Sequence, residues 1–229
     1  MEKDLVLILG AGRFGARAAR ILASEGKRSV WLVDPSSESL DQTAGLPVKR
    51  IRAEGVGFLV EWSDRIPDEA TVVPALPVHL SALWLCRAPG SRLKGRIVEV
   101  PESVKPGSAH TWKAEDGTLL VSFADFLCPE DCPEPEGYCT VTGERRPIPM
   151  FGLLRSLSAP GFNVHVIRSR QLAPGLGGYK FRELRRMLDR VEDAGPSAWL
   201  IGTACRCHGA LTAVHMEDTC SSSQTSLQP

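Results

Sequence analysis

Residues 5–25 read LVLILGAGRFGARAARILASE, and this stretch predicts the fold. Its first five residues are apolar, as is typical of a strand buried on both faces of a parallel sheet. The pattern Gly10-x-Gly12-x-x-Gly15 follows, and a helix rich in small residues begins there. Gly10 permits a tight turn, Gly12 lets a pyrophosphate approach the backbone, and Gly15 allows the helix to pack closely on the sheet. The stretch therefore predicts a dinucleotide at the helix start, where free N–H groups attract phosphate.

The second predicted strand, Val30–Val33, ends at Asp34, 24 residues after Gly10. An acid at this place accepts hydrogen bonds from the adenosine ribose and repels a 2′-phosphate, which favours NAD(H) over NADP(H). FAD uses the same kind of loop and acid, so FAD is the second candidate cofactor. Arg13 and Phe14 lie inside the loop and belong to the predicted cofactor site. A solvated Arg13 remains an equal alternative to a phosphate contact.

The segment LILGAGRFGARAARILASEGKRSVWLVD resembles the nucleotide-binding regulatory domain of potassium uptake systems, known as the KTN, RCK or TrkA-N type. The matching residues are Gly10, Gly12, Arg13, Phe14, Gly15 and Asp34. The resemblance covers residues 1–34 well and extends to about residue 85. It implies a Rossmann fold that binds NAD(H) or another adenine nucleotide. Ion-channel regulation is not carried over, because the rest of the chain departs from that family.

Composition narrows the class of protein. The 229 residues contain 27 Lys and Arg and 27 Asp and Glu, so net charge gives no argument for nucleic acid or an anionic membrane as partner. No apolar run reaches 18 residues, which predicts no membrane span. The short N-terminal apolar run leads directly into the glycine loop, so we expect no secretory signal and a cytoplasmic protein. Seven cysteines in such a protein favour metal ligands or redox groups over disulfides.

The chain is expected to form an α/β fold with four segments. These are a dinucleotide-binding Rossmann domain (1–88), a β and loop insertion that carries cysteines (89–150), a C-terminal α/β part that could rejoin the same sheet (151–217), and a disordered tail (218–229). Within the third segment we expect a glycine-rich loop at Gln171–Tyr179 and a helix at 210–215. His79 is expected after a parallel strand, either near the ligand or as an ordinary residue of a helix start.

Three cysteines, Cys128, Cys132 and Cys139, fall within twelve residues of the proline-rich stretch CPEDCPEPEGYCTVTGERR. Proline stiffens the chain after the first two, and a structureless loop of this length needs something to order it. A metal would do so, although the spacing matches neither the usual zinc pattern nor the usual iron–sulfur pattern. A flexible acidic loop with incidental cysteines is the alternative.

A second cysteine group, Cys205-Arg206-Cys207-His208, follows the predicted strand 198–204. With a helix after it, the helix dipole would stabilise a thiolate there. Cys205, Cys207 or His208 could therefore complete a metal site with the first three cysteines, or form a reactive thiol site near the cofactor. Cys86 is interpreted as a core residue and Cys220 as a surface thiol.

Two functions from different classes follow from these patterns. The first is a redox or electron-transfer protein, an NAD(H)- or FAD-linked oxidoreductase with a cysteine-ligated centre, iron–sulfur or zinc. Because nicotinamide transfers two electrons and most clusters one, it would need FAD or a flavoprotein partner unless the metal is structural. The second is an NAD(H)-responsive regulatory protein of the TrkA-N type, with zinc or free thiols. A zinc-stapled Rossmann protein of other activity is a third reading, and a homodimer is a possible assembly for any of them.

Overall fold

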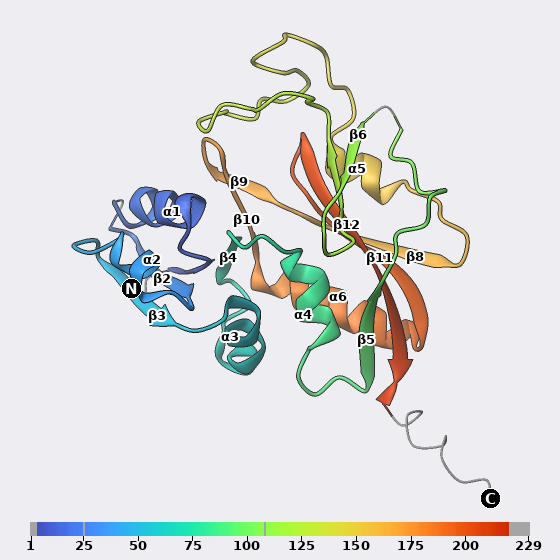
Figure 1. The fold of residues 1–229 in the computed structure, drawn as a ribbon, viewed down its shortest axis with the longest axis horizontal. Helices are drawn as coiled ribbons and strands as arrows, with labels where there is room; N and C mark the ends of the chain where they lie inside the picture. Colours follow the sequence, from blue (N-terminus) through green and yellow to red (C-terminus); the bar gives the residue numbers. More distant parts are fainter. Residues whose placement is uncertain (1–3, 25, 108, 220–229) are drawn as a thin grey trace, which may run out of the picture.

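Two sheets make up the computed structural model, which describes residues 4–24, 26–107 and 109–219 (Figure 1). The first sheet has the order β3 (Val48–Arg52), β2 (Arg28–Asp34), β1 (Asp4–Leu9), β4 (Thr71–Pro74), β10 (Leu176–Lys180) and β9 (Arg170–Ala173). The first four strands are parallel, in the order found in one half of doubly wound sheets. The predicted α/β class is thus confirmed. The two added strands depart from that pattern, because β10 pairs antiparallel with β4 and β9 pairs antiparallel with β10.

Three helices connect the parallel strands, a fourth follows β4, and together they cover both faces of this sheet. They are α1 (Arg13–Ser24), α2 (Ser37–Asp41), α3 (Gly55–Glu61) and α4 (Leu80–Cys86), with a short 3-10 turn at Ser63–Arg65. The alanines and Leu22 of α1 pack on one face of β1, where Val6 and Ile8 point. Leu7 and Leu9 point to the other face, toward α3 and α4. The burial of β1 on both faces explains why its sequence is a continuous apolar run.

The second sheet contains strands from two segments that the sequence analysis treated as separate. Its order is β6 (His110–Lys113), β7 (Leu119–Ser122), β12 (His208–Asp218), β11 (Ser197–Ala204) and β8 (Phe162–Arg168), and β5 (Leu93–Val98) also pairs with β12. The strands β5, β6 and β7 come from the expected insertion, whereas the others come from the expected C-terminal part. Residues 89–150 and 151–217 therefore build one sheet together, and only β9 and β10 return to the first sheet.

Two predicted elements are wrong. Gln171–Tyr179 is not a loop, because most of it lies in β9 and β10. A Cβ on Gly178 would stand 2.8 Å from the carbonyl oxygen of Val72 in β4, so the glycines allow strands to approach closely. Residues 210–215 are not a helix but part of the long strand β12, whose residues 209–216 pair with all eight residues of β11. A short apolar run fits either structure, and here sheet pairing decides.

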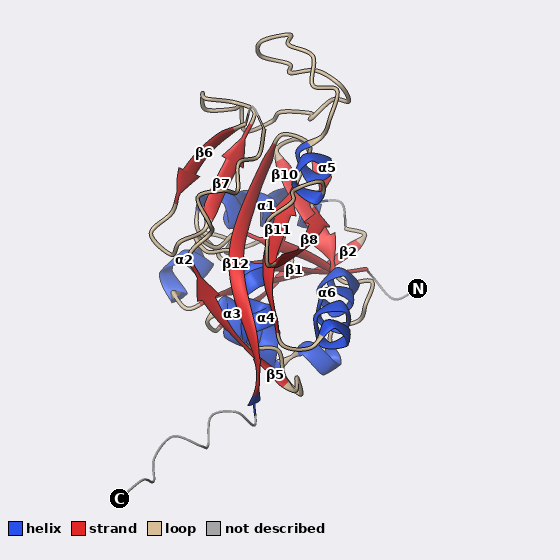
Figure 2. Cartoon of the chain, turned by 90° about the vertical axis from the view of Figure 1, so that its right-hand side faces the viewer, coloured by secondary structure: helices blue, strands red, loops and turns tan. Residues whose placement is uncertain are grey.

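Helices α4 and α6 (Phe181–Ala194) lie between the two sheets, as both views show (Figures 1 and 2). One continuous core joins them. It contains Leu7 and Val72 of the first sheet, Phe181 and Met187 of α6, and Trp199 of the second sheet. The remaining helix, α5 (Met150–Arg155), packs on β8 and β11 at the far side of the second sheet. No described helix has both the length and the apolar character needed to cross a membrane.

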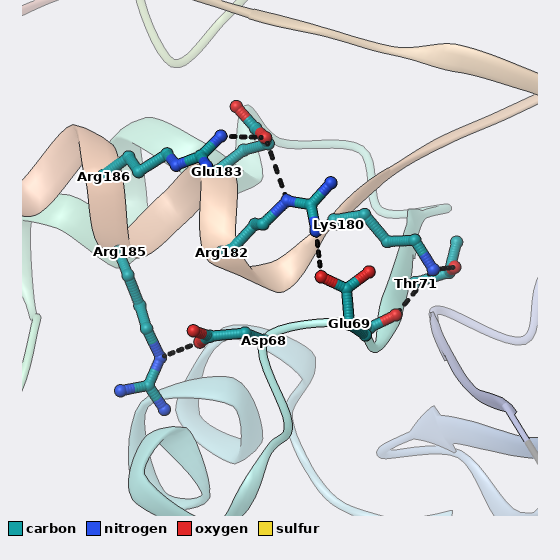
Figure 3. A network of polar contacts seen from close by, with 8 residues as sticks. All are labelled: Asp68, Glu69, Thr71, Lys180, Arg182, Glu183, Arg185 and Arg186. Carbon is teal, nitrogen blue, oxygen red and sulfur yellow. Dashed lines mark hydrogen bonds and ion pairs between the residues drawn. The ribbon is translucent and has the colours of Figure 1, made fainter.

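Polar contacts also fasten α6 to the loop before β4 (Figure 3). The Lys180 ammonium donates to the Glu69 carbonyl oxygen at 2.6 Å and to the Thr71 hydroxyl at 3.2 Å. Arg182 pairs with Glu69, and Arg185 pairs with Asp68 at 3.0 Å. Each pair is largely exposed and contributes at most about 1 kcal/mol. These contacts matter mainly because they fix the position of α6 relative to β4, since they join residues more than one hundred positions apart in the chain.

Candidate functional site: a glycine loop beside a cysteine-lined cavity

The three glycines of the loop after β1 stand in different surroundings. Gly10 has φ +101°, and a Cβ there would lie 2.3 Å from the Ala75 carbonyl oxygen. A Cβ on Gly15 would lie 1.8 Å from the Gly10 carbonyl oxygen, so α1 packs directly against the loop. A Cβ on Gly12 would meet nothing within 4 Å. Two glycines are therefore needed by the fold itself, whereas the third borders open space at the start of α1.

Asp34 at the end of β2 is tied to the same loop. One carboxylate oxygen accepts the Ala11 backbone N–H at 2.6 Å and the other accepts the Ser36 N–H at 2.8 Å. The acid and the glycine loop, 23 residues apart, are thus adjacent at the carboxyl ends of β1 and β2. This is the edge where open parallel sheets place ligands.

Arg13 and Phe14 turn away from the sheet and toward the cysteine-rich loop of residues 123–149, which lies above the β9–β10 hairpin in Figure 1. Arg13 pairs with Glu130 of that loop, and both side chains are partly open to solvent. Phe14 is 63% exposed, which is high for an aromatic side chain. Together they form one wall of a cavity of about 470 Å³.

All five predicted metal-binding cysteines line this cavity, together with His208. The cysteines are Cys128, Cys132, Cys139, Cys205 and Cys207. His208 lies between two of them, with Nε2 3.5 Å from the Cys128 sulfur and Nδ1 3.8 Å from the Cys205 sulfur. The structure thus brings together two groups that are more than sixty residues apart in the sequence. Cys86 lies elsewhere, in the core beside Gly95, and Cys220 lies outside the described residues.

Two of the sulfurs share a pattern of hydrogen bonds. The Cys205 sulfur accepts the backbone N–H groups of Cys207 and His208, both at 3.3 Å. The Cys139 sulfur accepts those of Val141 and Thr142, again two and three residues later. A glycine stands four residues after each cysteine, Gly143 and Gly209. Amide donors aimed at sulfur stabilise a thiolate, and they also tune cysteine-ligated metal centres.

The thiols differ in acidity. Burial raises the pKa of Cys139, but the hydrogen bonds from Thr142 and Val141 outweigh it, and the resulting pKa is lower than usual. Burial, followed by the charge of Glu134, raises the pKa of Cys205 to about 12. Burial also raises the pKa values of Cys128 and Cys207. Arg146 opposes this, since its guanidinium lies 2.9 Å from the Cys207 sulfur and lowers the pKa of several thiols.

No three His, Cys, Asp or Glu side chains among the described residues are placed to hold a single metal ion. The predicted helix after Cys205 and Cys207, with its dipole, is wrong. These residues form the turn of the β11–β12 hairpin, which is closed by a 2.9 Å hydrogen bond from the Cys205 N–H to the His208 carbonyl oxygen. The sulfurs are thus oriented by turn amides instead of by a helix.

Sequence reasoning missed the residues that hold the loop in place. Glu134 has φ +49°, a strained value for a residue other than glycine, and its carboxylate accepts the Arg206 N–H at 2.5 Å. Gly175, in the tip between β9 and β10, donates its N–H to the Cys132 carbonyl oxygen at 2.9 Å. Arg146 was overlooked as well. The only local signal for it was its place at the end of the cysteine-rich stretch.

Comparison with known proteins places most of the chain in one family. The family model described as "Uncharacterized protein, C-terminal domain" (AF_1314_C) matches residues 80–217. The chain belongs to this family. The AF_1314_C match begins at α4 and ends within β12, so it includes the second sheet and all five cysteines of the cavity. The glycine loop and Asp34 lie before it.

Two relatives add to this comparison, and the match to the first of them extends beyond the AF_1314_C region. The chain is similar to an uncharacterized protein of Archaeoglobus fulgidus, with 29% identity over 91% of this chain and 98% of that protein. It is also similar to a UDP-N-acetylmuramoylalanine--D-glutamate ligase of Thermosynechococcus vestitus, with 31% identity over 40% of this chain and 22% of the ligase. No solved structure matches the chain.

Proposed function

We propose that this protein binds a dinucleotide, NAD(H) in preference to FAD, and passes electrons to a cysteine-ligated metal centre, for which an iron–sulfur cluster is favoured. One observation carries the proposal. A single cavity is lined both by Arg13 and Phe14, next to the glycine loop, and by all five grouped cysteines. A cofactor on the loop would lie beside the thiols, as electron transfer between them requires.

The loop side of the cavity fits a dinucleotide. Gly12 leaves open space where phosphates would approach the N-terminus of α1, a helix of twelve residues. Arg13 is available there, and on phosphate binding it would exchange its pairing with Glu130 for the anion. Asp34 already lies against the loop, and it would accept hydrogen bonds from ribose hydroxyls.

The cysteine side of the cavity fits a multi-iron centre better than a single ion. Cys132 interacts electrostatically with Cys128 and with Cys207, and Cys128 also interacts with Cys139, so four thiols form a connected set. Iron–sulfur clusters are held by sets of cysteine thiolates, usually four, and this set has four. We assign these four as ligands. Cys205, held by its own turn amides and Glu134, is the reserve ligand.

The residues around these thiols would balance the charge that binding creates. Metal binding removes protons from the thiols, and the Arg146 guanidinium stands where it offsets the resulting negative charge. When bound, a cluster supplies one-electron transfer, whereas nicotinamide exchanges two electrons as hydride. With NAD(H) on the loop, a flavoprotein partner at the open cavity would take up the hydride and pass single electrons to the cluster. If FAD itself occupies the loop, it would pass single electrons to the cluster directly.

The decisive experiment uses the full chain purified without oxygen. We expect iron, sulfide and a broad absorption band near about 400 nm, and we expect Cys128→Ser, Cys132→Ser and Cys139→Ser each to abolish it. Cys86→Ser serves as the matched control, since it removes a core thiol outside the cavity and should keep the colour. Protein that holds neither metal nor colour would refute the metal centre while leaving the dinucleotide site intact.

A matched glycine pair tests the dinucleotide site separately. Gly12→Ala adds a Cβ into open space, so it should leave the melting temperature unchanged and weaken NADH binding by at least about tenfold. Gly15→Ala drives a Cβ into the Gly10 carbonyl and should lower the stability itself. Titration of NADH fluorescence and thermal unfolding measure the two effects. Unchanged NADH binding in folded Gly12→Ala protein would contradict the assigned site.

The second candidate is an NAD(H)-responsive regulatory protein with zinc or free thiols. The observation in its favour is the raised pKa of Cys128, Cys205 and Cys207, which keeps these thiols protonated at neutral pH in the absence of a metal. Turnover separates the two functions. A redox protein should speed the consumption of NADH when FAD and a one-electron acceptor such as ferricyanide are both added, whereas a sensor should bind NADH without oxidising it.

A further inference from the structure

A second cavity, of about 330 Å³, lies where β4 leaves the first sheet and shares no lining residue with the cysteine cavity. Its walls come from the segment between β4 and α4, from the β6–β7 hairpin and from the facing strands β11 and β12. Pro74, Leu76, Val78 and Leu120 make most of this surface apolar. The size is at the lower end of the range for small-molecule sites.

The charges around this cavity select against anions. Among the residues that the structure describes, no lysine or arginine lines it, and Asp116 is the one charged residue in its wall. A phosphate or carboxylate would therefore lose its hydration without gaining a cation, and it would face the Asp116 carboxylate. An uncharged molecule with an apolar body fits these walls.

A chain of hydroxyl groups around His79 supplies hydrogen-bond donors to the same space. His79 is 7% exposed, and burial lowers its pKa to about 4, against the opposing charge of Asp116, so the ring is neutral. Nδ1 lies 2.8 Å from the Thr212 hydroxyl, which in turn lies 2.9 Å from that of Thr118. On the other side Nε2 lies 3.0 Å from Thr203 and 2.9 Å from Ser81.

Counting protons shows that one donor is always left over. A neutral imidazole and four hydroxyls carry one mobile proton each. Ser81 and Thr203 also lie 2.9 Å apart, so these two hydroxyls form a closed triangle with Nε2. Because Nε2 either donates one proton or accepts one, the five groups can use at most four of their five protons among themselves. The remaining O–H lies on the Ser81 and Thr203 side in one ring tautomer and at Thr118 in the other. Because Ser81, Thr203 and Thr118 all line the cavity, a hydroxyl donor is available there in either tautomer.

Tyr179 provides a second, independent sign of a missing partner. It lines the cavity and is 3% exposed, yet its hydroxyl has no hydrogen-bond partner among the described residues. Buried hydroxyls nearly always find a partner, so such a group in a cavity wall calls for an acceptor from outside the chain.

We propose that this cavity binds a small uncharged organic molecule with an apolar body and a hydrogen-bond-accepting oxygen, such as a ketone. The apolar walls hold the body of the molecule, and the oxygen accepts from Tyr179 or from the spare hydroxyl of the His79 network. This site goes beyond the proposed electron-transfer function and does not depend on a dinucleotide or a metal.

Three ring compounds of similar shape test the proposal on the full chain. Acetophenone has the carbonyl acceptor, ethylbenzene lacks it, and benzoate replaces it with a charge. Calorimetry would measure affinity, and the ring nitrogen signals of His79, in protein labelled with ¹⁵N-histidine, would report the location. We expect acetophenone to bind about fivefold more tightly than ethylbenzene, as one hydrogen bond allows, and benzoate to bind at least about tenfold more weakly than acetophenone.

Two variants test whether the ligand binds in this cavity. Tyr179→Phe should weaken acetophenone binding while leaving ethylbenzene unchanged, and Ala210→Leu, which fills part of the wall, should weaken both. Leu127→Ala, in the wall of the other cavity, is the control and should change neither. The comparison of the three compounds needs only the wild-type protein, so it stands even if a variant unfolds. Equal affinity for benzoate and acetophenone, or His79 signals that do not move at saturation, would overturn the proposal.

Discussion

His79 couples the stability of the protein to pH through a single buried ring. Burial holds its pKa at about 4, whereas an unfolded histidine titrates near 6.5. Above pH 6.5 neither state is protonated, and the full stabilisation is present. As the pH falls from 6.5 toward 4, His79 binds a proton in the unfolded chain but not in the folded protein, so the free energy of unfolding decreases.

His79→Gln should remove this dependence. Between pH 7.5 and pH 5, His79 should lower the unfolding free energy of the wild type by about 2 kcal/mol. The decrease in the variant should be smaller than the decrease in the wild type by this amount. Urea unfolding of both proteins at the two pH values measures the difference. His165, whose pKa burial also lowers to about 4, is present in both proteins and cancels. Equal losses in the two proteins would show that His79 is protonated in the folded state.

At the scale of elements, the cysteine-rich loop depends on contacts made by other segments. Residues 123–149 contain no helix or strand, and their position is set by the β9–β10 tip and the β11–β12 turn. Gly175 is the closest of these contacts, with φ +68° and a Cβ position only 1.6 Å from the Glu130 carbonyl oxygen. The loop and the hairpin must therefore be ordered together.

Gly175→Ala should release the loop from the hairpin. We expect faster proteolytic cleavage within residues 123–149 and loss of any colour or metal that the cysteines hold. Gly161→Ala is the matched control, because Gly161 has φ +79° but a Cβ there would meet nothing within 4 Å. Both variants carry the backbone strain of about 1 kcal/mol, so the difference between them measures the contact with Glu130. If the loop of residues 123–149 is cleaved at the same rate in both variants, the contact with Glu130 does not order this loop.

Local sequence patterns were sufficient to predict some elements of the structure but not others. The glycine spacing and Asp34 predicted β1, α1 and β2, because these interactions lie within thirty residues. The grouping of Cys128, Cys132 and Cys139 indicated a site, but Arg146 and Gly175 could not be found, since their role arises from contacts across the fold. Gly177 and Gly178 suggested a loop, yet they serve close strand packing, which depends on a partner strand far away in sequence.

At the scale of the whole molecule, one core unites the two sheets. Residues of β1, β4, α4, α6, β11 and β12 belong to the same buried cluster. The expected boundary at residue 88 therefore cuts through shared packing, because the first sheet relies on Phe181, Leu184 and Met187 of α6 for part of its cover.

A fragment of residues 1–88 should consequently fail to fold alone. It lacks β10, which pairs with β4, and it lacks α6, so a large apolar surface would face water. Circular dichroism of the fragment should show little helix and no cooperative melting, whereas the full chain should unfold in one transition. A cooperatively melting fragment would show that the first four strands and their helices are an independent domain.

The pairing of β4 with β10 also has a consequence during synthesis of the chain. Thr71 and Lys180 are partners across the sheet, so the ribosome must add more than one hundred residues before β4 finds its neighbour. Until then β4 is an open edge, with unpaired backbone groups that can join a strand of another nascent chain. Slower elongation after residue 74 should prolong the exposure of this edge and therefore increase aggregation of the nascent chain.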